Sequence, residues 1–283
     1  MDRLEGWRIG PVSLTVSADR VSDVVAATGD DPNRWTAAAP PSFAAVTLFT
    51  VAKSLLAAPE LAGRGVIHAE QTFDWQRPYN IGSEVEVEAV VGRVRSRGAT
   101  TFVGLEVTAG DGSGQIQTSA SSFVAVETGG AESEDLGSEP GPEERGINEI
   151  PVEQPLPAVG SPLPLLAKSA SRGDLLRYAA ATGDWNPIHW DHGAAVSAGL
   201  PGIVAHGLLM AAWVVQAAAR HAPGDMPLRQ ARLRFRSPLR PAEPAVVVGE
   251  VLEEGSLRLR VDSGGEERVT ATVVLAELPS DGG

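Results

Sequence analysis

A five-residue string occurs twice in this chain, and this internal repeat constrains the fold more than any other sequence feature. Residues 26–30 and residues 180–184 both read AATGD. A serine lies nine positions upstream of each copy, at Ser17 and at Ser171. Self-similarity of this kind is typical of a duplicated structural unit. We therefore expect two related units in tandem.

The same order of elements is predicted in both units. Ser17 and Ser171 are suitable N-caps for a short helix. The apolar, alanine-rich segments at residues 43–58 and 205–222 are long enough for central helices that are buried on most sides. Alternating apolar and polar residues, as in residues 84–91, then predict antiparallel strands joined by turns rich in Gly, Asp and Ser. We predict an α+β fold in which two tandem antiparallel sheets each wrap around a long central helix.

The segment between the two units is strongly acidic. Residues 127–160 contain nine acidic residues, one arginine and many glycines and prolines, and they hold most of the net charge of −13. This composition predicts a flexible, self-repelling linker. Calcium binding would be another use for these carboxylates, but the spacing of an EF-hand is absent. We therefore divide the chain into an N-terminal unit (1–126), this acidic linker (127–160) and a C-terminal unit (161–283).

Composition excludes several classes of function. The chain has no cysteine, so disulfides, thiolate nucleophiles and thiolate-ligated metal centres are excluded. Its acidity argues against a nucleic-acid partner. No apolar stretch reaches about 18 residues, so no membrane insertion is expected, and the first residues do not resemble a signal peptide. We expect a cytoplasmic protein.

The two copies differ where chemistry could take place. The second copy carries His189 where the first has Trp35. Further on, His206 and Gly207 lie opposite Ala45 and Val46. This difference indicates that the second unit holds the reactive groups and that the first unit shapes the substrate channel.

The motif of the second unit resembles that of a known family. Residues 178–191 (YAAATGDWNPIHWD), followed by GLPGIVAHGLLM, are similar to the hydratase motif of the MaoC-like (R)-specific enoyl-CoA hydratases and (3R)-hydroxyacyl-thioester dehydratases. The resemblance implies a double hot-dog fold in which the first copy is degenerate. It also implies a hydro-lyase of fatty acid metabolism that interconverts (2E)-enoyl and (3R)-3-hydroxyacyl thioesters of CoA or of an acyl carrier protein. This chemistry requires no metal and no other cofactor.

The same resemblance implies the roles of three residues, and we expect a fourth to support them. Asp184 and His189 would be the catalytic pair. We favour Asp184 as the base that orients and deprotonates water and His189 as the group that exchanges a proton with the substrate, but the sequence leaves this division of roles open. The backbone N–H of Gly207, at the start of the central helix, would stabilise negative charge on the thioester oxygen. Asn186 would fix the loop or form a hydrogen bond to a catalytic side chain.

An arginine-rich stretch allows two interpretations. Arg232, Arg234 and Arg236 alternate along one predicted strand, so they would share one face of the sheet. That face could contact the phosphates of CoA or a pantetheine arm, or it could be exposed only to solvent. The tryptophans that could line an acyl channel could equally be part of the core; they are Trp75, Trp185, Trp190 and Trp213.

The remaining histidines also have alternative roles. His206 is expected to be structural, beneath the site, whereas His192 and His221 are expected to face solvent. A metal site is a less favoured alternative, because the histidine spacing of zinc proteases is absent; its ligands would be His189, Asp191, His192 and His206.

Two other functions compete with the hydro-lyase. A hot-dog acyl-CoA thioesterase would use a related fold with a differently placed carboxylate, and a non-catalytic subunit would bind acyl thioesters without turnover. Both a monomer and a homodimer are consistent with two units in one chain. The length and type of the acyl chain are left open by the sequence.

Overall fold

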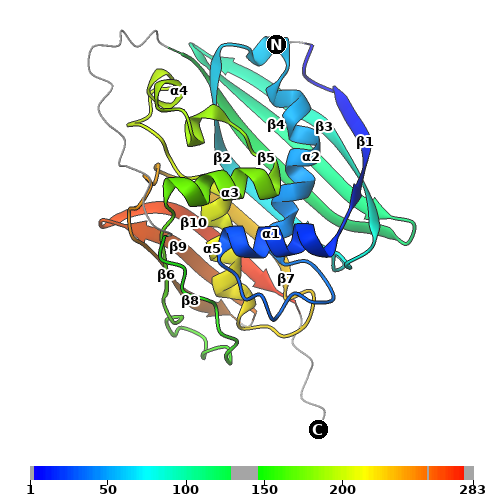
Figure 1. The fold of residues 1–283 in the computed structure, drawn as a ribbon, viewed down its shortest axis with the longest axis vertical. Helices are drawn as coiled ribbons and strands as arrows, with labels where there is room; N and C mark the ends of the chain where they lie inside the picture. Colours follow the sequence, from blue (N-terminus) through cyan, green and yellow to red (C-terminus); the bar gives the residue numbers. More distant parts are fainter. Residues whose placement is uncertain (1–2, 129–145, 254, 277–283) are drawn as a thin grey trace.

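The two sequence repeats form two similar halves of one continuous antiparallel sheet (Figure 1). We describe residues 3–128, 146–253 and 255–276 of a computed structural model. The strands of the first half are β1 (Arg8–Thr15), β2 (Arg64–Trp75), β3 (Glu84–Arg97), β4 (Thr100–Asp111) and β5 (Gly114–Glu127). Those of the second half are β6 (Leu166–Lys168), β7 (Leu228–Phe235), β8 (Ala245–Glu253), β9 (Ser256–Ser263) and β10 (Glu266–Leu275).

The helices also fall into two sets. The first half contains α1 (Ala18–Thr28), α2 (Ala44–Leu56) and the short 3-10 helices η1 (Pro41–Phe43) and η2 (Pro59–Leu61). The second half contains α3 (Arg172–Thr182), η3 (Pro187–His189), α4 (His192–Ser197) and α5 (Gly207–Ala219). The helix α2 packs on β1, β3 and β4, whereas α5 packs on the strands of the second half. The predicted α+β double hot-dog architecture is confirmed, with one long helix inside each five-stranded half.

The two halves meet edge to edge rather than as separate sheets. The strand order is β1-β3-β4-β5-β2-β7-β10-β9-β8-β6, so β2 and β7 form the junction. They pair antiparallel from Glu70↔Arg234 to Asp74↔Gln230. Before Glu70 in β2 and after Arg234 in β7, the two strands are no longer paired. The cavity described below is next to this separation.

The repeated AATGD string has a local structural explanation. Ser17 caps α1 by accepting a hydrogen bond from the backbone N–H of Arg20, and Ser171 caps α3 in a capping box with Asp174. Each helix ends at a left-handed glycine, Gly29 with φ 64° and Gly183 with φ 86°. Glycine adopts this conformation without steric cost. The aspartate that follows each glycine therefore leaves the helix at a fixed position.

The central helix of the second half is buried on almost all sides. Twelve of the thirteen residues of α5 are buried, which matches a helix surrounded by its sheet and by the other half. One buried hydrophobic cluster includes residues of both halves. Among the described residues, no helix is long and apolar enough to cross a membrane.

The predicted linker is described in part. Residues 129–145, which include most of its acidic residues, lie outside the described residues. Residues 146–160 run along the second half, where Gly146 N–H donates to Asp174 Oδ2 (2.8 Å) and Gln154 N–H donates to the carbonyl of Arg220 (2.9 Å). This part of the segment is therefore hydrogen-bonded to the second half.

Candidate active site

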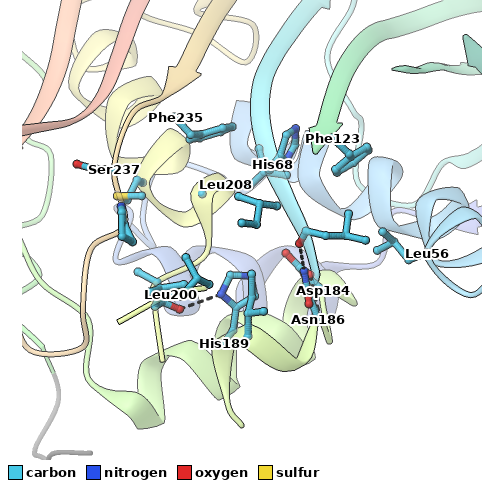
Figure 2. Close-up of a pocket in the computed structure, with 18 of the residues that line it drawn as sticks. Leu56, His68, Phe123, Asp184, Asn186, His189, Leu200, Leu208, Phe235 and Ser237 are labelled. Atoms are coloured by element: carbon cyan, nitrogen blue, oxygen red, sulfur yellow. Dashed lines mark hydrogen bonds between the residues drawn. The ribbon is translucent and has the colours of Figure 1, made fainter. Parts of the chain in front are cut away.

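A cavity of about 240 Å³ lies where the two halves meet, next to the point at which β2 and β7 separate. Its walls come from both halves (Figure 2). The first half contributes α2, β2 and β5 through apolar and aromatic side chains such as Phe49, Leu56 and Phe123. The second half contributes the loop after α3, the start of α5 and the end of β7. Both halves therefore supply residues to the lining, and the role of the first half as a substrate channel stays a prediction.

Asp184 lies in the wall of this cavity, directly after the left-handed Gly183 that ends α3. The side chain is only 6 % exposed, and its Oδ1 accepts a hydrogen bond from the backbone N–H of Asn186 at 3.4 Å. Burial raises the pKa of Asp184 to about 7, because a charged carboxylate loses its hydration there. Asp184 therefore titrates close to neutral pH.

His189 is held by one nitrogen. It lies in η3, and its Nδ1–H donates to the carbonyl of Val204 at 2.8 Å. This bond fixes the tautomer and leaves Nε2 as the nitrogen that can accept a proton. Burial lowers the pKa of His189 to about 4, so the ring is neutral at neutral pH.

His206 lies behind this pair. Its ring stacks on His189, with centroids 3.8 Å apart, and its Nε2–H donates to the carbonyl of Asp184 at 3.2 Å. It is fully buried, and burial and the neighbouring His189 lower its pKa well below the usual value. This position agrees with the structural role expected for His206.

The ligand atoms of Asp184, His189 and His206 all lie within 4.8 Å of one another. A metal ion would have to lie in the planes of both imidazoles. The face-to-face stacking of the rings disfavours that arrangement, and each ring already uses one nitrogen on a backbone carbonyl. The alternative metal set of the sequence differs from this cluster, because Asp191 instead caps α4 by accepting from Ala194 N–H at 2.9 Å.

Asn186 and Gly207 also line the cavity. Asn186 Nδ2–H donates to the carbonyl of Val66 at 2.8 Å, which ties the loop of the second half to β2 of the first half. Gly207 is the first residue of α5, where backbone N–H groups have no acceptor within the helix. A Cβ at this position would lie 3.1 Å from the ring of Phe235, so the helix start approaches the ring more closely than another residue would allow.

Arg232 and Arg234 of β7 and Arg236, which directly follows the strand, have different surroundings. All three are exposed, as expected for a shared face, but Arg236 is the one that lines the cavity. Arg232 and Arg234 lie on the outer side of the sheet, where Arg234 pairs with Glu70 at 3.0 Å. Contact with a CoA phosphate stays a prediction, and the geometry favours Arg236 for it.

Several minor expectations can be compared with the structure. The expectation that His221 faces solvent is wrong: it is 3 % exposed, because it packs under residues 154–155 and faces their carbonyls. His192 is half-buried.

The four tryptophans considered for an acyl channel, all among the described residues, do not line the cavity. Trp75 and Trp213 are in the core, whereas Trp185 and Trp190 are exposed.

The corresponding region of the first half is filled. Trp35, opposite His189 in the repeat, is 4 % exposed. Its neighbour Arg34 reaches into the second half and donates to the carbonyls of Ala219 (2.8 Å) and Ala222 (2.6 Å) at the end of α5. In the first half this region therefore forms a contact with the second half.

One cavity residue carries no sequence motif. His68 of β2 lies in the wall opposite Asp184 and His189 (Figure 2). The direction of its side chain depends on a bulge in β2 that no sequence pattern indicates.

Comparison with known proteins gives a family description for each half of the chain. The description "MaoC like domain" matches residues 148–274, and "FAS1-like, dehydratase domain region" matches residues 3–116. The chain belongs to the MaoC-like dehydratase family. A MaoC-like domain thus covers the half with Asp184 and His189, and a dehydratase region of another description covers the half without them.

Two curated relatives are similar in sequence to this MaoC-like protein. A UPF0336 protein of Cutibacterium acnes is 32% identical over 97 residues, which cover 32% of this chain and 68% of that protein. The 3-hydroxyacyl-thioester dehydratase X of Mycobacterium tuberculosis is 28% identical over 213 residues, which cover 75% of this chain and 69% of that protein.

Solved structures share the fold of this MaoC-like protein. A MaoC-like dehydratase superposes with a TM-score of 0.79 at 20% identity, covering 97% of this chain and 98% of that chain. A Mycobacterium tuberculosis protein described as having a double hotdog fold has a TM-score of 0.67 at 14% identity, covering 97% of both chains. These likenesses establish the double hot-dog fold.

Proposed function

We propose that this protein catalyses the reversible hydration of (2E)-enoyl thioesters to (3R)-3-hydroxyacyl thioesters. The observation that carries the proposal is the meeting of Asp184 and His189 in one wall of a largely apolar cavity, beside the first residue of α5. The relative named 3-hydroxyacyl-thioester dehydratase X supports the same class of reaction.

In the dehydration direction, two protons move. Nε2 of His189 removes the proton from Cα, and the carboxyl of Asp184 protonates the hydroxyl that leaves Cβ as water. In the hydration direction, Asp184 takes a proton from the attacking water while His189 returns one to Cα. Each direction leaves the pair with the same total of one proton.

The protonation states suit this division of roles. Below a pH of about 7 Asp184 is protonated, and above a pH of about 4 His189 is neutral. Between these values the pair holds one proton, on Asp184, which is the state that begins dehydration. Burial alone therefore gives a protonated carboxyl group, which can act as an acid, beside a neutral imidazole, which can act as a base.

The start of α5 supplies the third requirement. Charge develops on the thioester oxygen as the Cα proton leaves, and the backbone N–H of Gly207 can donate to it. Loss of one such donor typically costs about 2.7–4 kcal/mol of transition-state stabilisation. The absence of a side chain at Gly207 lets the thioester approach this N–H group.

The two ends of the cavity differ in polarity, which orients the substrate. Phe49, Leu56 and Phe123 form an apolar end that suits an acyl chain. Arg236 and Ser237 lie at the other end, where a CoA or carrier-bound pantetheine would leave the site. The reacting carbons then lie between them, near Asp184 and His189.

Two variants test the proposal. Asp184→Asn and His189→Gln should fold but lose about 10²–10⁴-fold in kcat, the usual contribution of a general acid or base. Asp191→Asn is the matched control, because Asp191 caps α4 and asparagine caps a helix equally well. The measurement is the loss of enoyl thioester absorbance in purified protein whose circular dichroism matches the wild type.

Each outcome distinguishes the proposal from its competitors. Near-normal activity in both variants would exclude the assigned pair. Release of free thiol from a saturated acyl-CoA, without hydration of an enoyl-CoA, would indicate a thioesterase instead. Tight binding of enoyl-CoA without any turnover by the wild type would indicate a binding subunit.

A further inference from the structure

His68 is an imidazole in the cavity wall for which the reaction has no use. It belongs to β2, in which residues 71, 73 and 75 are buried and Glu70 is exposed. In a regular strand His68 would share the outer face with Glu70, because side chains alternate. The pairing of β2 with β5 shifts register between His68 and Glu70. This bulge turns His68 to the inner side and into the cavity lining.

Two aromatic rings flank His68. Its ring lies 4.6 Å from the ring of Phe123 and 5.0 Å from that of Phe235, measured between centroids. Its Nε2 is shielded from solvent and from the open part of the cavity, and it makes no hydrogen bond of normal geometry among the described residues, with the Gln71 side chain and the Glu70 backbone as its nearest polar neighbours. A shielded polar atom without a partner destabilises a protein, so an apolar side chain would suit this position better unless the nitrogen serves a ligand.

The position of His68 indicates which part of a substrate it meets. Phe235, His68 and Phe123 form the wall opposite Asp184 and His189, with His68 between the two phenylalanines (Figure 2). Phe235 contacts the start of α5 at Gly207, where the thioester would lie. Phe123 belongs to the apolar end of the cavity. An acyl chain that extends from Gly207 towards Phe123 therefore passes His68 beyond its reacting carbons.

The charge of His68 restricts the chemistry of its partner. Burial lowers the pKa of His68 to about 4, so the ring is neutral at neutral pH. A neutral imidazole offers one donor and one acceptor and does not attract a carboxylate or phosphate. A half-turn of the ring about its Cβ–Cγ bond exchanges the positions of Nε2 and Cε1, so nitrogen can be presented at either side. A hydroxyl both donates and accepts hydrogen bonds. It can therefore pair with the imidazole nitrogen in either tautomer and in either orientation of the ring.

We propose that His68 is a specificity-determining residue that selects acyl chains bearing a hydroxyl group beyond C3. The proposal rests on the proposed function for the orientation of the thioester, and it adds the class of acyl chain. A purely aliphatic chain leaves the nitrogen unpaired, whereas a hydroxylated chain forms a hydrogen bond with it.

Binding of unreactive ligands tests this without turnover. Octanoyl-CoA and octanoyl-CoAs with a hydroxyl at C5, C6 or C7 lack both the double bond and the 3-hydroxyl, so they cannot be dehydrated or hydrated. Isothermal titration calorimetry should give a dissociation constant about 10-fold lower for at least one hydroxylated ligand than for octanoyl-CoA. His68→Phe keeps an aromatic ring between Phe123 and Phe235 and should bring this ratio close to 1 without weakening octanoyl-CoA binding. His68→Gln should restore part of the preference, because its Nε2 lies near the position of the imidazole nitrogen.

Several results would overturn the proposal. These are equal affinity of the wild type for all four ligands, no binding of any of them, or a preference that survives in His68→Phe. An equal loss of affinity for all ligands in His68→Phe would also overturn it, because His68 would then contact the thioester or pantetheine that they share. Failure of the proposed function would be recorded separately, as absence of hydration in the enoyl thioester assay.

Discussion

At the scale of single residues, burial determines what Asp184 and His189 can do. Both side chains lose hydration in the cavity wall, and this moves their pKa values in opposite directions, to about 7 and about 4. Neither is brought back to its usual value by an ion pair: the backbone N–H of Asn186 and the carbonyl of Val204 are their hydrogen-bond partners. The result is a carboxylic acid beside a neutral imidazole at mildly acidic to neutral pH.

This pair predicts the pH dependence of the reaction. Activity requires one proton on the pair, so kcat/KM should fall above a pH of about 7, as Asp184 loses its proton, and below about 4, as His189 gains one. A profile of kcat/KM against pH in buffers of constant ionic strength checks this. In Asp184→Asn the residual activity should lose the alkaline limb. A wild-type profile that stays flat from pH 6 to pH 9 would contradict the proposed roles.

At the scale of secondary-structure elements, features that depend on neighbouring residues can be predicted from the sequence, whereas features that depend on distant residues cannot. The serine caps and the terminal glycines of α1 and α3 depend on neighbours within a few residues, and they are visible in the repeat. The meeting of Asp184 and His189 follows from a short loop and could be expected from the motif. The bulge at His68 and the reach of Arg34 to α5 depend on partners far away in the chain, so no local pattern reveals them.

Arg34 gives a prediction at this scale. Its guanidinium donates to two carbonyls at the end of α5, the helix whose other end lies at the cavity. Hydrogen bonds from a charged group contribute about 1.5–3 kcal/mol, and a cation suits a helix C-terminus. Arg34→Ala should therefore lower the free energy of unfolding in urea by about 1.5–3 kcal/mol.

Arg95→Ala is the matched control for this change. Arg95 is an exposed arginine of β3, and exposed substitutions of this kind usually change stability by no more than about 0.5 kcal/mol. An equal free energy of unfolding for the two variants would show that the hydrogen bonds of Arg34 to the end of α5 do not stabilise the protein.

At the scale of the whole molecule, the two similar halves share one continuous sheet, and the candidate site lies between them. The halves share the β2–β7 junction and a common hydrophobic cluster. The cavity needs both, since the second half holds Asp184 and His189 and the first half holds the apolar end. The sequence predicts two wrapped helices, but it does not predict that their sheets join, because edge pairing between β2 and β7 follows from the packing of the halves.

A shared sheet and core predict cooperative unfolding. Thermal unfolding followed by far-ultraviolet circular dichroism and by tryptophan fluorescence should give a single transition with the same midpoint. Tryptophans occur in both halves, so fluorescence reports on each of them. Two separate transitions would show that the halves fold independently and that their junction contributes little.

In the proposed reaction, Asp184 and His189 together add water to an enoyl thioester. Both groups lie in the same wall of the cavity (Figure 2), so the hydroxyl and the proton must reach one face of the planar double bond. Hydration of a (2E)-enoyl-CoA in D₂O, with the product analysed by NMR and chiral chromatography, tests this most directly. We predict a single (3R)-3-hydroxyacyl-CoA in which deuterium and hydroxyl have been added syn. A product of anti addition, a mixture of configurations, or no product at all would contradict the account.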